Sequence, residues 1–306
     1  MNDAIDDERF VCSLICGPAR PALDEALLAR VGAALSALGV ADGEDWRMLA
    51  PGVACELGVS RRDGVAEAAL EALQGAPVDV NIVPAANREK RFLIADMDST
   101  IIEQECLDEL ADFAGLKDEI AAVTERAMRG ELDFEKALLE RVARLEGLDA
   151  SALERTWTER ISLTPGATTL VATMRERRGF AALVSGGFTF FTDKVARAAG
   201  FDVHRANELE IAENALTGDV RKPILGRDAK AAALNELTRG RGLSPADALA
   251  VGDGANDLAM IGAAGLGVAF RAKPAVAAAA DARGYHGDLT ALLFLQGLSA
   301  DDFVGA

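Results

Sequence analysis

The chain has 306 residues, of which 50% are hydrophobic and 26% charged, and its formal net charge is −17. That length accommodates about two domains, and the acidic balance argues against nucleic acid or an anionic membrane surface as a partner. No uncharged apolar stretch is long enough to cross a bilayer, no secretory signal is apparent, and the four cysteines lack zinc-type pairing with the two histidines, so we expect buried free thiols and a cytoplasmic location.

Residues 1–86 predict a small, separate domain. Apolar spacing indicates a strand over 9–16, a helix over 23–38, a strand-like stretch over 46–58, a short helix over 64–74 and an alternating strand over 78–83. We interpret the order as roughly βαββαβ, a ferredoxin-like arrangement. It is similar to ACT domains, which implies regulation or homodimerisation through this unit; a domain that only stabilises its neighbour is the alternative. The polar residues 85–90 predict a linker.

Residues 91–295 predict an α/β domain with a parallel sheet. Short, continuously apolar runs are typical of strands buried on both faces, and helical stretches separate them; these runs are Phe92–Ala95, Ala181–Val184, Ala248–Val251 and Leu266–Phe270. The helical interval at about 105–162 is too long for one crossover helix and predicts an inserted cap. Residues 209–218 predict a hairpin that turns at Glu213 and Asn214, and 296–306 form a C-terminal tail.

Four polar elements follow this domain's predicted strands or begin its helices. They are Asp96-Met97-Asp98-Ser99-Thr100, Ser185-Gly186-Gly187, Lys230 at a helix start, and Gly252-Asp253-Gly254-Ala255-Asn256-Asp257. Each alone has an ordinary explanation as a turn, a cap or a surface lysine. Together they fall at the carboxyl edge of the sheet, where ligands of such sheets bind.

Their chemistry fits phosphoryl transfer. Asp96 can attack phosphorus and form an aspartyl-phosphate, and Asp98 can protonate the leaving oxygen and then activate water. Lys230 and Mg²⁺ would neutralise phosphate charge. The expected magnesium ligands are the Asp96 carboxylate, the Asp98 backbone carbonyl and Asp253, while Asp257 orients a metal-bound water or a neighbouring ligand.

These elements, in this order, resemble the haloacid dehalogenase superfamily, and within it the phosphoserine phosphatase family. The resemblance extends over residues 92 to about 295 and includes Glu105–Leu110, Ala127–Gly130, Leu163–Gly166 and Leu216–Asp219. It implies a Rossmann-like core with a helical cap, and magnesium-dependent hydrolysis of phosphoserine, the last step of serine biosynthesis. It also implies that Ser185, Gly186 and Lys230 bind the phosphate, with Asn256 beside them.

The resemblance further implies that Glu105 and Arg141 bind the amino-acid end of the substrate. Phosphoserine carries a carboxylate and an ammonium besides its phosphate, so a selective pocket needs a second cation and a second anion. Met128 and Phe134 would form an apolar wall that excludes water.

Two alternatives stay open. The first is a related phosphatase or phosphotransferase for another small phosphomonoester, such as phosphothreonine or phosphohomoserine, because one methyl group discriminates by only about 1–3 kcal/mol. The second is a non-enzymatic phospho-acceptor switch. Asp98 and the inserted cap argue against a switch, because a second carboxylate would hasten loss of the acyl phosphate.

Overall fold

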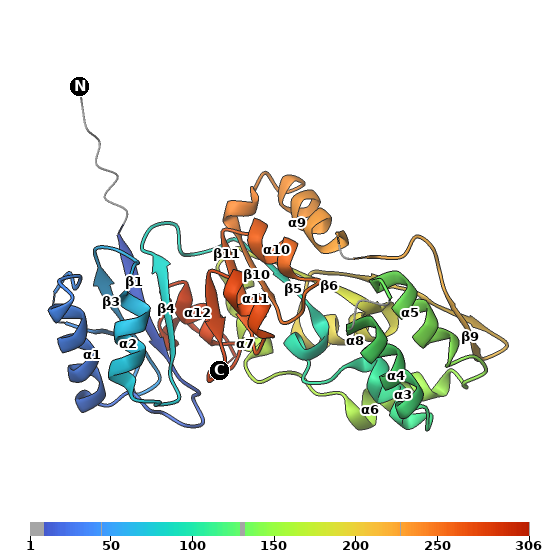
Figure 1. Ribbon diagram of the computed structural model, residues 1–306. Helices are drawn as coiled ribbons and strands as arrows, with labels where there is room; N and C mark the ends of the chain where they lie inside the picture. The colour runs from blue at the N-terminus through green and yellow to red at the C-terminus, as the bar shows by residue number, and fades with distance from the viewer. Residues whose placement is uncertain (1–8, 44, 129–131, 227, 306) are drawn as a thin grey trace.

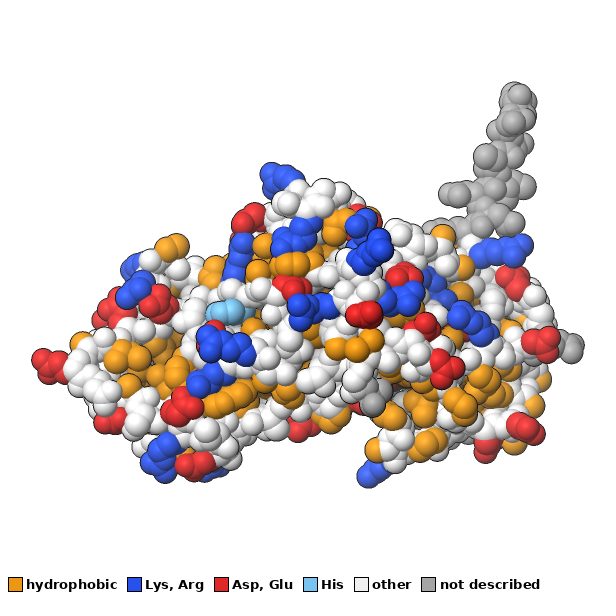
Figure 2. All heavy atoms as spheres, turned by 180° about the vertical axis from the view of Figure 1, so that it is seen from behind, with side chains coloured by type: hydrophobic (Ala, Val, Ile, Leu, Met, Phe, Trp, Pro, Cys, Tyr) orange, Lys and Arg blue, Asp and Glu red, His pale blue; other side chains and the backbone are white. Residues whose placement is uncertain are grey.

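The computed structural model describes residues 9–43, 45–128, 132–226 and 228–305. Three parts follow one another along the molecule: an N-terminal domain, a central sheet with helices on both faces, and a helical cap (Figure 1). Positive and negative side chains are interspersed over the face seen from behind (Figure 2). Within the described ranges, no helix is long and apolar enough to cross a membrane.

The N-terminal domain has the expected βαββαβ order. Its antiparallel sheet has the order β2-β3-β1-β4, and its elements are β1 (Phe10–Ile15), α1 (Glu25–Ala37), β2 (Arg47–Ala50), β3 (Ala54–Val59), α2 (Val65–Leu73) and β4 (Asp79–Pro84). Pro51 and Gly52 divide the predicted stretch 46–58 into two strands, since Gly52 has a φ of +72° and turns the chain. Helices α1 and α2 cover one face of the sheet, and the other face packs against the central domain.

Buried polar contacts join the N-terminal domain to the central domain. The Asp79 carboxylate accepts hydrogen bonds from the backbone N–H groups of Tyr285, His286 and Gly287. The predicted linker is itself anchored, because Lys90 is only 7% exposed and the Arg88 guanidinium pairs with Glu56 and donates to the Leu295 carbonyl. These contacts hold the domain against the outer strands of the central sheet and helix α12 (Ala291–Leu295).

The central sheet is parallel, with the order β12-β11-β10-β5-β6-β7. Its strands are β5 (Phe92–Ala95), β6 (Phe180–Phe188), β7 (Val203–Asn207), β10 (Ala248–Gly252), β11 (Leu266–Phe270) and β12 (Ala282–Gly284). One face packs on α7 (Ala167–Glu176), α8 (Thr189–Ala199) and α12 (Ala291–Leu295). The other packs on α9 (Ala229–Arg239) and α10 (Leu258–Ala263), with α11 (Pro274–Ala279) beside β11. The α/β fold expected from the apolar runs is confirmed.

Strands β7 and β12 were not among the expected strands. β7 is an edge strand whose half-buried side chains include His204 and Arg205, so it lacks a continuous apolar run. β12 has only three residues. Short 3₁₀ turns, η2 (Pro245–Asp247) and η3 (Ala300–Asp302), complete the domain, and the segment after α12 is packed, since the Val304 N–H donates to the Thr173 hydroxyl.

The cap consists of α3 (Cys106–Phe113), α4 (Lys117–Met128), α5 (Phe134–Ala143) and α6 (Ser151–Arg160). Two chain segments connect it to the core side by side, with Ile102 bridged to Leu163 and the Glu103 N–H donating to the Ser162 carbonyl. The hairpin β8 (Leu209–Ala212) and β9 (Ala215–Val220) turns at Glu213 and Asn214, as expected, and β9 packs against α5.

Candidate active site

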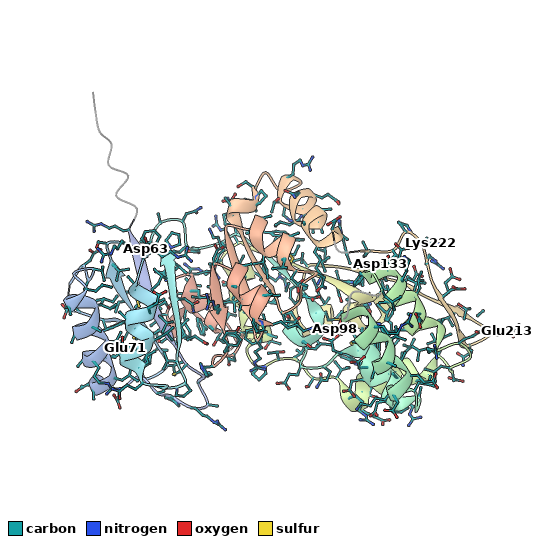
Figure 3. The ribbon with its side chains drawn as sticks, in the orientation of Figure 1. Asp63, Glu71, Asp98, Asp133, Glu213 and Lys222 are labelled. Atoms are coloured by element: carbon teal, nitrogen blue, oxygen red, sulfur yellow. The ribbon has the colours of Figure 1, made fainter. Side chains whose placement is uncertain are left out.

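Asp96 directly follows β5, which the sheet holds between β10 and β6. Its N–H donates to the Val251 carbonyl at 3.0 Å, so the pairing of β5 with β10 fixes the position of the Asp96 backbone. The chain then enters the wide turn η1 (Met97–Ile101), in which Ser99 has a left-handed φ of 54°. This turn presents Asp98 where the core meets the cap (Figure 3).

Lys230 bridges two of the predicted carboxylates. Its Nζ lies 2.7 Å from Oδ2 of Asp96 and 2.6 Å from Oδ1 of Asp257. Lys230 is 3% exposed and Asp257 is fully buried. Burial opposes the charge on Lys230, but the two carboxylates outweigh it and raise the pKa of the amine. Lys230 is therefore a cation buried within the site, and the surface-lysine alternative does not apply.

The loop after β10 supplies the remaining acidic groups. Asp257 accepts the Gly254 N–H through Oδ2, which folds the loop back on itself. A Cβ at Gly252 would lie 2.3 Å from the Asp257 Cγ, so only glycine fits there. Asn256 is half-buried within this loop, beside Gly254.

The crowded carboxylates change one another's ionisation. Burial, followed by the charge of Asp96, raises the pKa of Asp253 to about 6 and that of Asp257 to about 7. Asp96, Asp253 and Asp257 each offer an oxygen, and these atoms all lie within 4.8 Å of one another. Three carboxylates against one ammonium leave an excess of negative charge. Because the donors are hard oxygens, the set fits a hard divalent cation.

Asp98 belongs to a different set of contacts. Its Oδ1 accepts the N–H of Cys106, the first residue of α3, at 2.8 Å, and its Oδ2 accepts the Ser185 hydroxyl at 3.2 Å. Burial, followed by the charge of Asp96, raises the pKa of Asp98 to about 6. Its carboxylate is therefore not part of the group formed by Asp96, Asp253 and Asp257, and a proton can be exchanged there near neutral pH.

The Ser185-Gly186-Gly187 segment lies near the carboxyl end of β6. Ser185 is 1% exposed, and its hydroxyl also accepts the Gly187 N–H at 2.9 Å. A Cβ at Gly187 would lie 2.9 Å from Oδ2 of Asp98, and one at Gly186 would lie 2.9 Å from Cζ of Phe134. A side chain at either position would have to displace Asp98 or Phe134, and Phe134 of the cap contacts the core at this point.

Two charged groups on the cap side face the same region. Glu105 precedes α3, and its Oε1 accepts the Ser99 hydroxyl at 2.6 Å. Desolvation, followed by the charge of Asp98, raises the pKa of Glu105 to about 8, although its solvent-exposed side chain lets water screen part of this effect. Burial lowers the pKa of Arg141, against the opposing charges of Asp108, Glu105 and Asp98.

Arg141 keeps most of its donors available. Its Nε donates to the Ala137 carbonyl within α5, and among the described residues it forms no ion pair. Met128 ends α4, and its side chain lies outside the described part of the structure, so its expected role as an apolar wall stays a prediction.

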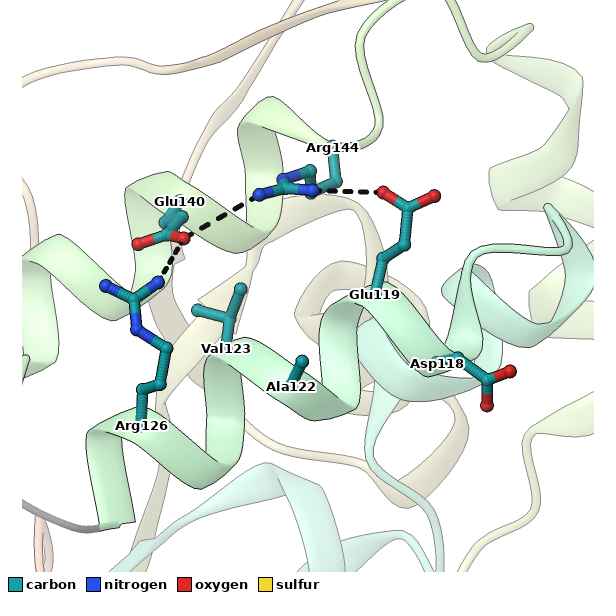
Figure 4. A pocket seen from close by; sticks show the side chains of 7 residues that line it. All are labelled: Asp118, Glu119, Ala122, Val123, Arg126, Glu140 and Arg144. Atoms are coloured by element: carbon teal, nitrogen blue, oxygen red, sulfur yellow. Dashed lines mark hydrogen bonds and ion pairs between the residues drawn. The ribbon is translucent and has the colours of Figure 1, made fainter.

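A separate hollow lies on the cap, between α4 and α5 (Figure 4). Glu140 pairs with both Arg126 and Arg144, and Arg144 also pairs with Glu119. None of the predicted site residues lines this hollow. The network joins the two helices and thereby supports the position of α5, which carries Arg141.

Sequence reasoning missed two residues that organise the site. Ser99 was quoted only as part of a motif, yet it holds Glu105. Asn207, at the end of β7, is 2% exposed and bonds to Gly186 and Leu225. Asn207 is a polar residue at the end of an edge strand, and the sequence pattern around it does not distinguish it from a loop residue.

Comparison with known proteins identifies relatives over most of the chain. The haloacid dehalogenase-like hydrolase family matches residues 93–262. A phosphoserine phosphatase of Archaeoglobus fulgidus is 49% identical over 195 residues, which cover 64% of this chain and 56% of that protein. The chain spans about half the length of the first curated relatives it matches.

Solved structures extend the likeness to the N-terminal domain. A haloacid dehalogenase family hydrolase of Salmonella enterica serovar Typhi superposes with a TM-score of 0.81 at 27% identity, over 94% of this chain and 98% of that one. A phosphoserine phosphatase with a phospho-aspartyl intermediate analogue superposes with a TM-score of 0.63 at 37% identity, over 67% of this chain and 98% of that one.

Proposed function

The chain belongs to the haloacid dehalogenase-like hydrolases, and on that premise we propose that it hydrolyses O-phospho-L-serine to L-serine and phosphate through an aspartyl-phosphate. One observation carries the proposal. Asp96 is paired with the buried Lys230, while Asp98, two residues later, is held apart from them by Ser185 and Cys106. The two carboxylates therefore have different surroundings and can have different roles.

In the first step an oxygen of Asp96 attacks phosphorus in line, and the bond between phosphorus and the ester oxygen breaks. The departing alkoxide takes a proton from Asp98, and serine leaves as the alcohol. A pKa of about 6 makes Asp98 a competent acid near neutral pH. The Lys230 ammonium balances the charge on Asp96 and on the transferring group.

In the second step water attacks the phosphorus of the acyl phosphate. Asp98, now ionised, accepts the proton of that water, and the bond between phosphorus and the Asp96 oxygen breaks. Phosphate leaves and both carboxylates return to their starting states. The Ser185 hydroxyl and the backbone of the Gly186–Gly187 turn, whose Gly187 N–H donates to Ser185 in this structure, would bind the phosphate oxygens throughout, because backbone N–H groups in such turns bind anions.

We assign magnesium to the carboxylates of Asp96 and Asp253 and the Asp98 carbonyl, with Asp257 beside them. The close approach of the three carboxylates supports this assignment. When bound, the ion would supply charge neutralisation to the transferring phosphoryl group. Asp257 already pairs with Lys230 and Gly254, which favours its predicted orienting role over direct ligation.

Glu105 and Arg141 would select the substrate. Arg141 lies within electrostatic reach of Glu105 and Asp98, and its planar guanidinium suits a carboxylate. Glu105 suits the ammonium, which would favour its ionised form on binding. Phe134, in contact with Gly186, would exclude water over the phosphate. Asn256 would contact the substrate from the loop after β10.

Homodimerisation through the N-terminal domain remains a proposal. The central domain covers one face of its sheet, whereas α1, α2 and the edge strand β2 face outward and are available for pairing. The four cysteines are free and buried, which supports a reducing compartment such as the cytoplasm.

A substrate panel tests the proposed function. kcat/KM is measured for phosphoserine, phosphothreonine, phosphohomoserine and sugar phosphates, with and without Mg²⁺ and free serine. We expect phosphoserine to be preferred and turnover to require Mg²⁺. Asp96→Asn serves as the control, and it should abolish turnover with an unchanged circular dichroism spectrum. Preference for another phosphomonoester would reject the substrate, and turnover by Asp96→Asn would reject the nucleophile.

A further inference from the structure

Asn207 lies at the carboxyl end of β7, outside the residues assigned to the reaction. It is 2% exposed. Its Nδ2 donates to the Gly186 carbonyl at 2.9 Å and more weakly to the Leu225 carbonyl at 3.4 Å, and its Oδ1 accepts the Leu225 N–H at 2.7 Å. A buried amide that satisfies backbone groups on two separate segments fixes their relative positions.

The first of those segments bulges out of the sheet. Val184 pairs with Arg205 and Phe188 with Asn207, so three residues of β6 stand against the single residue Ala206 of β7. The Gly186 carbonyl has therefore left the regular ladder, and the Asn207 amide replaces the missing backbone donor.

The peptide unit between Gly186 and Gly187 transmits this contact to the site. Its carbonyl accepts from Asn207, and its N–H donates to the Ser185 hydroxyl. That hydroxyl in turn donates to Asp98. Because the peptide unit is planar, fixing its carbonyl also fixes its N–H.

The second segment leads to the catalytic lysine. Leu225 is held by Asn207 on both its N–H and its carbonyl. A few residues later α9 begins, and its second residue is Lys230. Asn207 therefore joins the segment that contains Ser185 to the segment that precedes α9 in the chain.

We propose that Asn207 is a positioning residue that holds the Ser185–Gly187 turn and the Leu225 segment in the register that phosphate transfer requires. This inference rests on the proposed phosphatase function and deepens it. The hydrogen bonds of Asn207 within the described residues go to Gly186 and Leu225 and reach neither the cap nor the carboxylates, so we expect it to act on the phosphate end of any substrate and not on substrate selection.

The test uses the full chain with two substitutions. Asn207→Asp removes both donors and keeps the acceptor for Leu225, and Asn207→Ala removes all three bonds without adding charge. We expect kcat to fall about 10- to 100-fold and the inhibition constant of inorganic phosphate to rise several-fold. The decrease should be equal for phosphoserine and p-nitrophenyl phosphate.

Asn81 offers a matched control. It is 4% exposed and makes the same pair of backbone bonds, to the carbonyl and N–H of Arg283, far from the site. Asn81→Asp should lose stability with an unchanged phosphate inhibition constant. A smaller folded fraction lowers the apparent kcat but leaves that constant unchanged, so the constant separates positioning from stability.

Three results would overturn the proposal. The first is a phosphate inhibition constant in both Asn207 variants that equals that of Asn81→Asp. The second is a decrease in kcat for phosphoserine that does not occur for p-nitrophenyl phosphate. The third is failure of both Asn207 variants to fold when Asn81→Asp folds, which would assign Asn207 to stability alone.

Failure of the proposed function is distinguishable from these results. If the wild-type protein hydrolyses p-nitrophenyl phosphate but not phosphoserine, the substrate is wrong and the Asn207 comparison proceeds unchanged. If it hydrolyses neither, titration calorimetry with inorganic phosphate still compares wild type with the variants, and equal affinities would reject the role of Asn207.

Discussion

Substituting Lys230 by methionine removes the only cation that directly contacts the carboxylate group within the described residues. The methionine side chain has similar volume, so packing is kept. Asp96 and Asp257 each lose an ion pair, at 2.7 and 2.6 Å, and both are almost fully buried. Removing one partner of a buried pair typically costs about 3–5 kcal/mol, because the remaining charge is uncompensated. We therefore expect the melting temperature at pH 8 in EDTA to fall by about 10 °C.

The loss of stability caused by Lys230→Met should depend on pH in a definite direction. In the wild type, the folded-state pKa values of about 6 for Asp253 and about 7 for Asp257 lie above their ordinary value of 3.8. The folded state therefore binds more protons than the unfolded state, and stability falls as pH rises through these values. Losing Lys230 raises both pKa values further, so the deficit of the variant should be largest above pH 7 and smaller at pH 5.

Thermal unfolding at pH 5 and pH 8, with EDTA or with Mg²⁺, measures this effect. Mg²⁺ should restore part of the loss at pH 8, since a cation then replaces the missing charge. Lys90→Met is the matched control: Lys90 is 7% exposed but donates to the carbonyls of Asn87 and Ala246, so its loss should not respond to Mg²⁺. An unchanged melting temperature for Lys230→Met at pH 8 in EDTA would refute the reasoning.

Three further substitutions have separate expected outcomes. Asp98→Asn should lower kcat about 10²- to 10⁴-fold by removing the acid and base; steady-state rates close to wild type would contradict that role. Arg141→Ala should raise KM for phosphoserine far more than for p-nitrophenyl phosphate, and equal increases would mean that Arg141 does not contact the carboxylate. Asp79→Asn should destabilise the protein by about 1–3 kcal/mol in urea unfolding, because three backbone N–H groups lose a charged acceptor, while kcat stays unchanged; an unaltered midpoint would show that this interface contributes little.

The sequence was most informative where strands are buried on both faces. The run Phe92–Ala95 is apolar throughout. Its end places Asp96 at the carboxyl end of a strand, even when the neighbouring strands are unknown. The same holds for β10 and the acidic loop that follows. The hairpin turn at Glu213 and Asn214 was also predicted, and both residues adopt the positive φ that such a turn requires.

Contacts between distant segments could not be predicted in this way. Nothing in the sequence indicates that the Asp98 carboxylate accepts the Cys106 N–H and the Ser185 hydroxyl. Lys230 stands on a helix like any surface lysine, and only the packing of α9 against the sheet buries it. Glu105 and Arg141 came from resemblance alone, since charged residues on helices are usually solvated.

Because the chain is synthesised from its N-terminus, the N-terminal domain and the central sheet become complete at different times. Strand β5 needs β6 and β10 as neighbours, so the site cannot form until residues beyond the acidic loop have left the ribosome. The N-terminal sheet is complete much earlier, but its face with Val11, Ile15 and Val83 is covered only when α12 arrives. During that interval an apolar sheet face is exposed on the nascent chain, which makes this the stage most prone to aggregation.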